Sequence, residues 1–211
     1  MPASLRQRGR SGAAARSAAQ TFDTYAEKLA AGSRYASKQE WDVAASAFRE
    51  AIGLKPDEPA AYYNLGSVLA KSGHPVEATR RLLEAKERLL VGSERWAVAT
   101  AAAFEALMQK DMIEVAKPEW WNDEGLKALS FIAVGAAPND GPVIQMRAAV
   151  LSGLYGTHWE VGPRTAADLK EAAAHFEQAA AMHPAPAAKA QLTNFAESCT
   201  KAVAKINTSA E

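Results

Sequence analysis

The sequence predicts an all-α fold built as a stack of helical hairpins. Alanine supplies 48 of the 211 residues, and it is both the best helix former and small enough for helices to approach closely. Apolar residues recur every three or four positions along most of the chain, which is the period of an amphipathic helix. No segment keeps the two-residue alternation of a strand. A helix–turn–helix pattern also repeats every 34 residues, so successive hairpins are expected to stack.

Composition narrows the classes of function. The 24 basic and 24 acidic residues cancel, and the pI is about 6.9. A general binder of nucleic acid or of membrane surfaces would usually show a basic excess, and no run approaches 18 consecutive apolar residues. We therefore expect no nucleic-acid partner and no membrane insertion. The single cysteine, Cys199, excludes an internal disulfide.

Residues 1–22 differ from the rest of the chain in charge. They contain Arg6, Arg8, Arg10 and Arg16 and no acidic residue, which leaves the remainder mildly acidic. The segment has no apolar period, and we predict that it is a disordered basic tail. The alternatives are a transit segment for import into an organelle and an arm that binds nucleic acid. A cytoplasmic location is expected for a tail, and an organelle for a transit segment.

Two helical hairpins are predicted in the first half of the chain. Their helices follow apolar runs at 25–36, 41–52, 59–69 and 78–89. Pro56 ends the second run, and Pro59 suits the first turn of the third. Polar breaks at 37–40 and 72–74 separate the two helices of each hairpin.

The two hairpins align when one is shifted by 34 positions. The aligned pairs are Gly32 with Gly66, Tyr35 with Leu69, Ala44 with Ala78, Phe48 with Leu82, and Ala51 with Ala85. Small residues such as Gly32 and Gly66 are expected where the two helices of a hairpin cross most closely. Large residues such as Phe48 and Leu82 fill the neighbouring gaps. A single hairpin cannot bury its apolar face, so the units must stack.

This alternation of small and large residues resembles the tetratricopeptide repeat family, most strongly over residues 25–92. Departures from the family pattern occur at Lys28, Ala31, Gln39 and Leu90. The resemblance implies a right-handed superhelical stack of about four hairpins plus a C-terminal capping helix. This domain would occupy residues 23–208.

The second half continues the pattern less regularly. A third hairpin is predicted over residues 93–140, about 14 residues longer than the 34-residue period. Ser93 would cap its first helix, and Pro118 would begin its second. A fourth hairpin begins at Pro142 and contains an extra loop, 156–164. The last helix carries on one stripe Leu192, Phe195, Ala196, Cys199, Val203 and Ile206, as a capping helix requires.

Catalytic and metal-binding patterns are weak. His74 and His183 have no cysteine, histidine or acid at the spacing of metal ligands, so we expect no metal site and no cofactor. Glu171 and His175 share a helix face, but such a pair is more often a surface contact. Cys199 lies on an apolar stripe without an activating base, which favours a buried structural thiol. The chain is therefore predicted not to be an enzyme.

The resemblance also implies where a partner would bind, because the first helices of such repeats line a concave groove. Carried over by position, the groove residues are Leu29, Ser33, Tyr63, Asn64, Ser67 and Lys71. Asn64 matches family members that grip a C-terminal carboxylate. Leu29 and Ser33, however, stand where those members have lysine and asparagine. We therefore expect an apolar helix or an extended segment rather than an acidic tail.

The extra loop is a second candidate contact. It contains Trp159 and Arg164 beside glycine and proline, and loops on rigid scaffolds often bind partners. Trp120 and Trp121 either fill gaps left by the irregular third hairpin or anchor a partner.

Together these observations predict a non-catalytic adaptor or scaffold that binds a protein segment in its groove. The alternative is a structural subunit of a larger multiprotein assembly. A monomer with a free groove would favour the first function, and obligate co-assembly the second. A hydrolytic or other enzyme with its site in the loop 156–164 is a remote third option.

Overall fold

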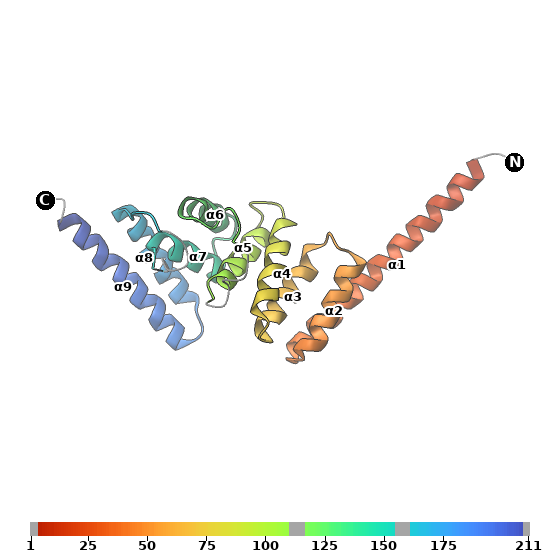
Figure 1. Cartoon of the computed structure of the whole chain (residues 1–211), viewed down its shortest axis with the longest axis horizontal. Coiled ribbons are helices and arrows are strands. Elements are labelled where there is room, and N and C mark those ends of the chain that lie inside the picture. Colours follow the sequence, from red (N-terminus) through yellow and green to blue (C-terminus); the bar gives the residue numbers. More distant parts are fainter. Residues whose placement is uncertain (1–3, 110–116, 155–160, 209–211) are drawn as a thin grey trace. The chain divides into compact units, whose positions relative to one another are not determined.

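The computed structural model describes residues 4–109, 117–154 and 161–208, and all regular elements within them are α-helices. In chain order these are α1 (Ser4–Ser37), α2 (Trp41–Leu54), α3 (Pro59–Lys71), α4 (Pro75–Glu87), α5 (Glu94–Leu107), α6 (Asp123–Ala136), α7 (Gly141–Ser152), α8 (Ala166–Met182) and α9 (Pro186–Thr208) (Figure 1). The prediction of an all-α helical repeat stack is confirmed.

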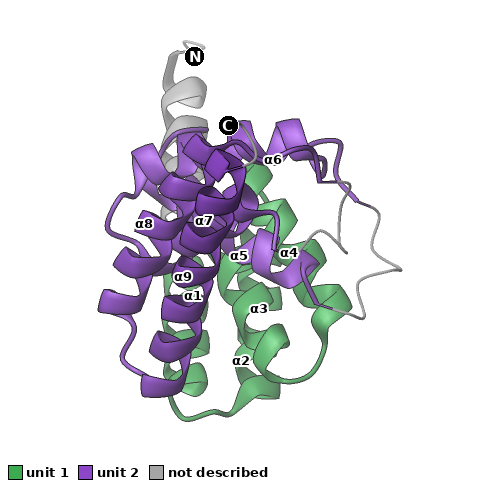
Figure 2. Ribbon diagram, turned by 90° about the vertical axis from the view of Figure 1, so that its left-hand side faces the viewer, with its two compact units in different colours: residues 1–88 green, residues 89–211 purple. Residues whose placement is uncertain are grey.

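Contacts divide the chain into two compact units (Figure 2). Unit 1 comprises residues 1–88 with α1 to α4, and unit 2 comprises residues 89–211 with α5 to α9. Helix α1 begins at Ser4 and runs without a break from the basic segment into the first repeat. The division of the chain at residue 22, and any targeting role of the basic segment, stay predictions.

Unit 1 consists of the two hairpins predicted from the period. Helix α1 packs against α2, α2 against α3, and α3 against α4. Phe48, Leu65 and Leu69 lie in the core between them and are almost completely buried. Helices α3 and α4 each begin with a proline, whose fixed backbone angle suits the first turn of a helix. The 34-residue repeat of the sequence is therefore a repeat of structure.

Glycine allows the two helices of each hairpin to approach closely. A Cβ atom added to Gly32 would lie 2.5 Å from the Phe48 ring, and one added to Gly66 would lie 2.8 Å from Cγ of Leu82. Both distances are shorter than carbon atoms in contact normally allow. The predicted pairing of a small residue on the first helix with a large one on the second is thus confirmed in both repeats.

The turns inside the two hairpins share one backbone conformation, although their residues differ. Gln39 has a φ of 62°, and Gly73, at the aligned position, has a φ of 82°. In each turn the next amide donates to the carbonyl five residues back, at 3.0 Å after Gln39 and 2.9 Å after Gly73. This left-handed conformation is easily adopted by glycine but costs other residues about 1–2 kcal/mol.

Unit 2 contains the hairpins α5–α6 and α7–α8, followed by α9. Ser93 caps α5 as predicted, because its Oγ accepts a hydrogen bond from the amide three residues on at 3.2 Å. The prediction that the second helix begins at Pro118 is wrong. Helix α6 begins at Asp123, and the Asn122 side chain caps it by accepting from the Gly125 amide at 2.9 Å.

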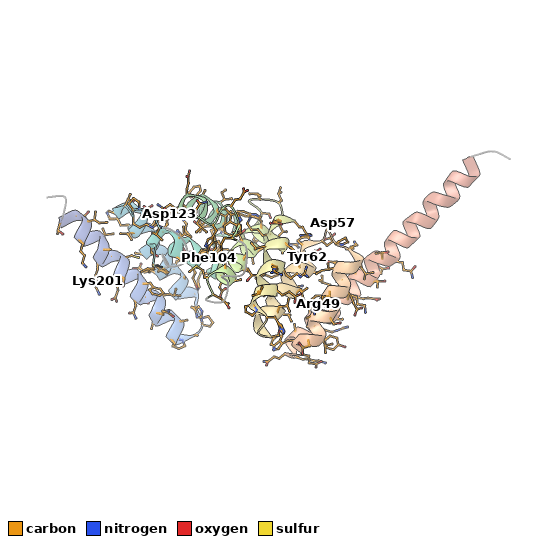
Figure 3. The ribbon with its side chains drawn as sticks, viewed as in Figure 1. Arg49, Asp57, Tyr62, Phe104, Asp123 and Lys201 are labelled. Carbon is orange, nitrogen blue, oxygen red and sulfur yellow. The ribbon has the colours of Figure 1, made fainter. Side chains whose placement is uncertain are left out.

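Trp121 occupies the turn before α6. Its side chain is buried, and its ring centroid lies 5.6 Å from that of Phe104 on α5 (labelled in Figure 3) and 5.7 Å from that of Trp120. The ring therefore packs against α5 from outside any helix. Of the two interpretations of this tryptophan, the structure favours gap filling.

Helix α9 packs against α8 and buries one stripe of its own side chains. The rings of Phe195 on α9 and Phe176 on α8 lie 5.4 Å apart, centroid to centroid. Cys199 lies in the same core, and its burial raises the pKa of the thiol, which disfavours the reactive thiolate. The predicted stripe and the buried thiol are confirmed, except that Ile206 at the end of the stripe is exposed.

Candidate functional site

Helices α1 and α3 contact each other in unit 1, and one stripe of each, exposed on α1 and partly exposed on α3, forms the candidate surface. A shift of 34 residues superimposes one stripe on the other. The aligned pairs are Ala26 with Ala60, Ala30 with Asn64, Ser33 with Ser67, and Ser37 with Lys71. None of these eight residues is buried. We call this surface, which includes four of the predicted contact residues, the α1–α3 face.

Leu29 and Tyr63 each lie one position away from the α1–α3 face. Leu29 is half-buried and packs against the core that contains Phe48 as well as the core that contains Tyr25. Tyr63 is also half-buried. These two predicted contact residues therefore border the α1–α3 face and at the same time belong to the packing of unit 1.

The two aligned serines use their hydroxyl groups within their own helices. Ser33 Oγ donates to the Leu29 carbonyl at 3.0 Å, and Ser67 Oγ donates to the Tyr63 carbonyl at 2.9 Å. The side chain of Asn64 makes no hydrogen bond to any other described residue. An amide of this kind offers two donors and an acceptor to a ligand, so Asn64 is the uncharged side chain of the α1–α3 face that has the most hydrogen-bonding groups available.

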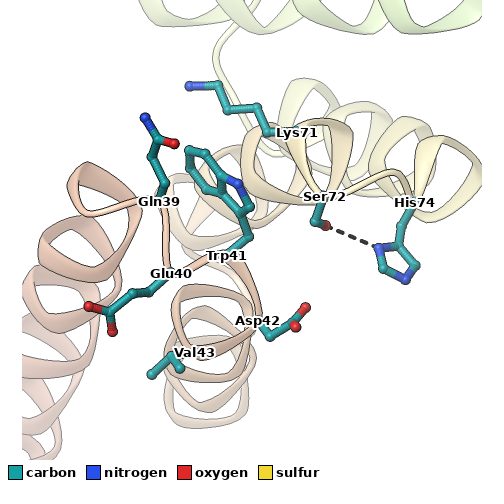
Figure 4. A pocket seen from close by; sticks show the side chains of 8 residues that line it. All are labelled: Gln39, Glu40, Trp41, Asp42, Val43, Lys71, Ser72 and His74. Atoms are coloured by element: carbon teal, nitrogen blue, oxygen red, sulfur yellow. Dashed lines mark hydrogen bonds between the residues drawn. The ribbon is translucent and has the colours of Figure 1, made fainter.

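Lys71, at the end of α3, lies beside a shallow hollow. Its Nζ atom is 5.4 Å from the centroid of the Trp41 ring, within the range of a cation–π contact (Figure 4). The hollow is lined by Gln39, Glu40, Trp41, Asp42, Val43, Lys71, Ser72 and His74. Its charges are mixed, since Glu40 and Asp42 face the same space as Lys71. In the sequence, Trp41 is only the first residue of the apolar run 41–52, and nothing in that pattern indicates its contact with Lys71.

Arg164, predicted to contact a partner, uses both of its terminal guanidinium nitrogens within unit 2, whereas its Nε is buried without a hydrogen bond. Its guanidinium nitrogens donate to the two carboxylate oxygens of Asp123 at 2.6 and 3.0 Å and to the Val150 carbonyl at 2.9 Å. The same guanidinium holds the pKa of the Asp123 carboxyl below its usual value. Arg164 thus fastens the end of the extra loop to α6 and α7. Trp159 lies outside the described residues.

The weak catalytic candidates, Glu171 and His175, take part in an ionic contact with Arg147. His175 Nε2 lies 3.6 Å from Glu171 Oε1, and the same carboxylate oxygen accepts a hydrogen bond from Arg147 Nε at 2.8 Å. The Arg147 side chain is nearly buried, so Glu171 neutralises a charge in the core of unit 2. Over the described residues, no cluster of three potential metal-ligating side chains occurs, and no helix is long and apolar enough to span a membrane.

Comparison with known proteins agrees with the repeat. Residues 32–73 match a family model described as TPR repeat. No curated protein matches the chain. Among solved structures, a crystal structure of MamA aligns with a TM-score of 0.47 and 13% identity, over 82% of this chain and 96% of that one.

The matched stretch begins at Gly32, where α1 approaches α2 closely, and ends at Gly73, the glycine in the turn between α3 and α4. It therefore covers the C-terminal end of α1, all of α2 and all of α3. Repeats of this type generally act as scaffolds that bind other proteins and are generally non-catalytic. Residues 32–73 therefore carry a tetratricopeptide-type repeat, as the sequence resemblance implied.

Proposed function

We propose that the chain is an adaptor that captures a segment of a partner protein on the α1–α3 face of unit 1. The observation that supports this function most is the asymmetry between the two aligned stripes. Helix α1 contributes only alanine and serine, whereas α3 contributes Asn64 and Lys71. The α1 stripe would therefore let a bound segment approach closely, and the α3 stripe would supply polar contacts to it.

The small residues of α1 suit a partner whose backbone or apolar side chains come close. The distance between packed helices is set by the side chains at the contact, and it is short where these are alanine or serine. Lys71 is the only charged residue among the eight on the α1–α3 face. We therefore expect the bound segment to present an apolar or uncharged surface, as a helix or an extended strand.

Asn64 would orient the segment in this scheme. Its amide can donate to a backbone carbonyl and accept from a backbone amide of the partner, which a flat apolar face cannot do. Leaving a buried backbone group of the partner unpaired costs about 1–3 kcal/mol. Tyr63, bordering Asn64, would add aromatic contact area, and the loop of Trp159 stays a predicted second contact.

The test is quantitative affinity purification from the native source with Tyr63→Ala combined with Asn64→Ala. A matched control changes two exposed residues of α8 in unit 2, Glu177→Ala with Gln178→Ala. We expect the first variant to lose at least tenfold of the specific partner that the wild type and the control retain. Circular dichroism checks that both variants are folded. Equal recovery with all three proteins would refute binding on this face, and Trp159→Ala tests the loop separately.

A further inference from the structure

The outward face of α6 differs from those of the other second helices of the hairpins. In α6, Leu126, Ser130 and Ala133 are buried at the spacing of Ala44, Phe48 and Ala51 in α2, which aligns the two helices. The corresponding four outward positions are Ser46, Arg49, Glu50 and Gly53 in α2, Arg80, Leu83, Glu84 and Glu87 in α4, Ala128, Phe131, Ile132 and Gly135 in α6, and Ala174, Glu177, Gln178 and Ala181 in α8. Only in α6 do both central positions hold large apolar side chains.

These α6 side chains are open to solvent. Phe131 is 66% exposed and Ile132 is 42% exposed, and Ala128 and Gly135 are exposed beside them. A Cβ atom added to Gly92 would lie 3.9 Å from Cγ2 of Ile132. The segment before α5 therefore reaches Ile132 at Gly92, and Leu90, two residues earlier, is 80% exposed. An exposed apolar patch of this kind typically marks a contact site.

The Phe131 ring makes a cation–π contact with Arg147, whose guanidinium is itself held by hydrogen bonds. The guanidinium carbon of Arg147 lies 5.6 Å from the centroid of the Phe131 ring. Arg147 in turn donates to Glu171 at 2.8 Å and to the Lys127 carbonyl at 3.0 Å. A ring that is held in place in the free protein loses little conformational freedom on binding, which is the property of an anchor residue.

We propose that this face binds a second copy of the chain, with the two α6 helices antiparallel about a two-fold axis between Phe131 and Ile132. In that register Phe131 of each copy meets Ile132 of the other, and Ala128 meets Gly135. Large side chains occupy the centre, and small ones at both ends let the helices approach. A two-fold interface requires a patch that complements itself in this way.

The lack of charge and the size of the patch determine the strength of the contact. None of the four outward residues of α6 is charged, so no ionised group is desolvated when two copies meet. Only four outward residues form the centre of the patch on each copy, so we expect the total buried area to fall below the about 1,200 Å² of a standard stable interface. The dimer is therefore weak and depends on protein concentration.

Sedimentation equilibrium of the full chain between about 10 µM and 1 mM covers the range expected of so small an interface. We expect the average mass to rise from 22.5 kDa toward twice that value. Phe131→Glu should raise the dissociation constant at least tenfold while remaining folded, because the new carboxylate can pair with Arg147. Met182→Glu, at an apolar residue of α8 that is 45% exposed, is the control and should dimerise like the wild type.

Two results of this experiment would overturn the proposal. One is a wild type that stays monomeric at every concentration, in which case a different protein covers the face. The other is a Phe131→Glu variant that associates as strongly as the wild type.

Cysteine cross-linking tests the register. Mixed Ala128→Cys and Gly135→Cys chains should form a disulfide between the two variants faster than either variant forms one with itself. Cys199 is 2% exposed and does not compete. Cross-linking of Ala128→Cys mainly to itself, or none in a mixture that still dimerises, contradicts the antiparallel arrangement.

Discussion

At the scale of single residues, the two turns of unit 1 show how one conformation tolerates two different side chains. Gln39 and Gly73 hold the same left-handed backbone at aligned positions. A Cβ atom added to Gly73 would meet nothing within 4 Å, so the difference between the turns lies in the backbone and not in packing. Gln39 is thus a departure from the family pattern that the first repeat accommodates at a cost in stability.

We expect Gln39→Gly to stabilise the protein by roughly 0.5–1 kcal/mol, because glycine removes the strain but also gains freedom in the unfolded chain. The reverse change, Gly73→Gln, should destabilise it by about 1 kcal/mol. Urea denaturation measures both. If Gln39→Gly left the midpoint unchanged or lowered it, strain at this turn would not limit the stability of unit 1.

At the scale of elements, ionic contacts hold the end of the extra loop to its neighbours. Asp123 at the start of α6 accepts two hydrogen bonds from Arg164, whose guanidinium also donates to the last turn of α7. Lys127 lies 3.3 Å from the same carboxylate. Asp123, labelled in Figure 3, therefore connects three segments of unit 2 through one ionised group.

Replacing Asp123 with Asn should destabilise the protein at pH 7 by about 1.5–3 kcal/mol, the range for hydrogen bonds to a charged group. Arg164 lowers the pKa of Asp123 in the folded state. An unfolded Asp titrates near 3.9, so the contribution of the Asp123 carboxylate to the free energy of unfolding is complete above about pH 5. This contribution is lost as the pH falls through the lower pKa of the folded state.

Chemical denaturation between pH 7 and pH 3 measures this dependence. The difference in unfolding free energy between the wild type and Asp123→Asn should shrink as the pH falls. A difference that is as large at pH 3 as at pH 7 would show that the carboxylate charge is not what stabilises the contact.

At the scale of the whole molecule, the chain has two compact units with separate sets of buried residues. Leu65 belongs to the core of unit 1, and Leu151 belongs to a core of unit 2. In repeat proteins each unit contacts only its neighbours, so local stability is set by nearby packing. Damage to one core should therefore loosen mainly the unit that contains it.

Leu65→Ala should lower stability by about 2–5 kcal/mol, because it opens a cavity at a fully buried site. Hydrogen exchange followed by mass spectrometry should show faster exchange in α1 to α4 than in unit 2. Leu151→Ala is the matched control and should show the reverse pattern. Equal acceleration in both units by either variant would mean that the chain opens as one cooperative body.

Several features could be predicted because they depend on residue size and period alone. The shift by 34 positions aligns Gly32 with Gly66 and Phe48 with Leu82, and the structure places each glycine against the large residue of its own hairpin. The start of α6 could not be predicted in the same way. Pro118 resembles a helix start, but Trp121 packs outside the helix against α5, a contact with a residue far away in the sequence.

For the candidate contact residues too, the sequence predicts what depends on local spacing but not what depends on long-range contacts. Spacing alone was sufficient to place Asn64, Ser67 and Lys71 on one exposed stripe, because helical periodicity is a local property. It could not show that Arg164 is occupied by Asp123, since that pairing joins residues 41 positions apart. Nor could it show that Ser130 is buried while Phe131 is open.

The hairpins and their close-packing glycines follow from the order of small and large residues along the chain. The open face of α6 does not. In α6 the buried position aligned with Phe48 holds Ser130, whose Oγ accepts a hydrogen bond from Arg147 at 3.2 Å. Because Ser130 occupies this interior position and bonds to the buried guanidinium of Arg147, the neighbouring Phe131 faces solvent. Which side of a helix is free to bind depends on such long-range contacts, and these exist only once the chain has folded.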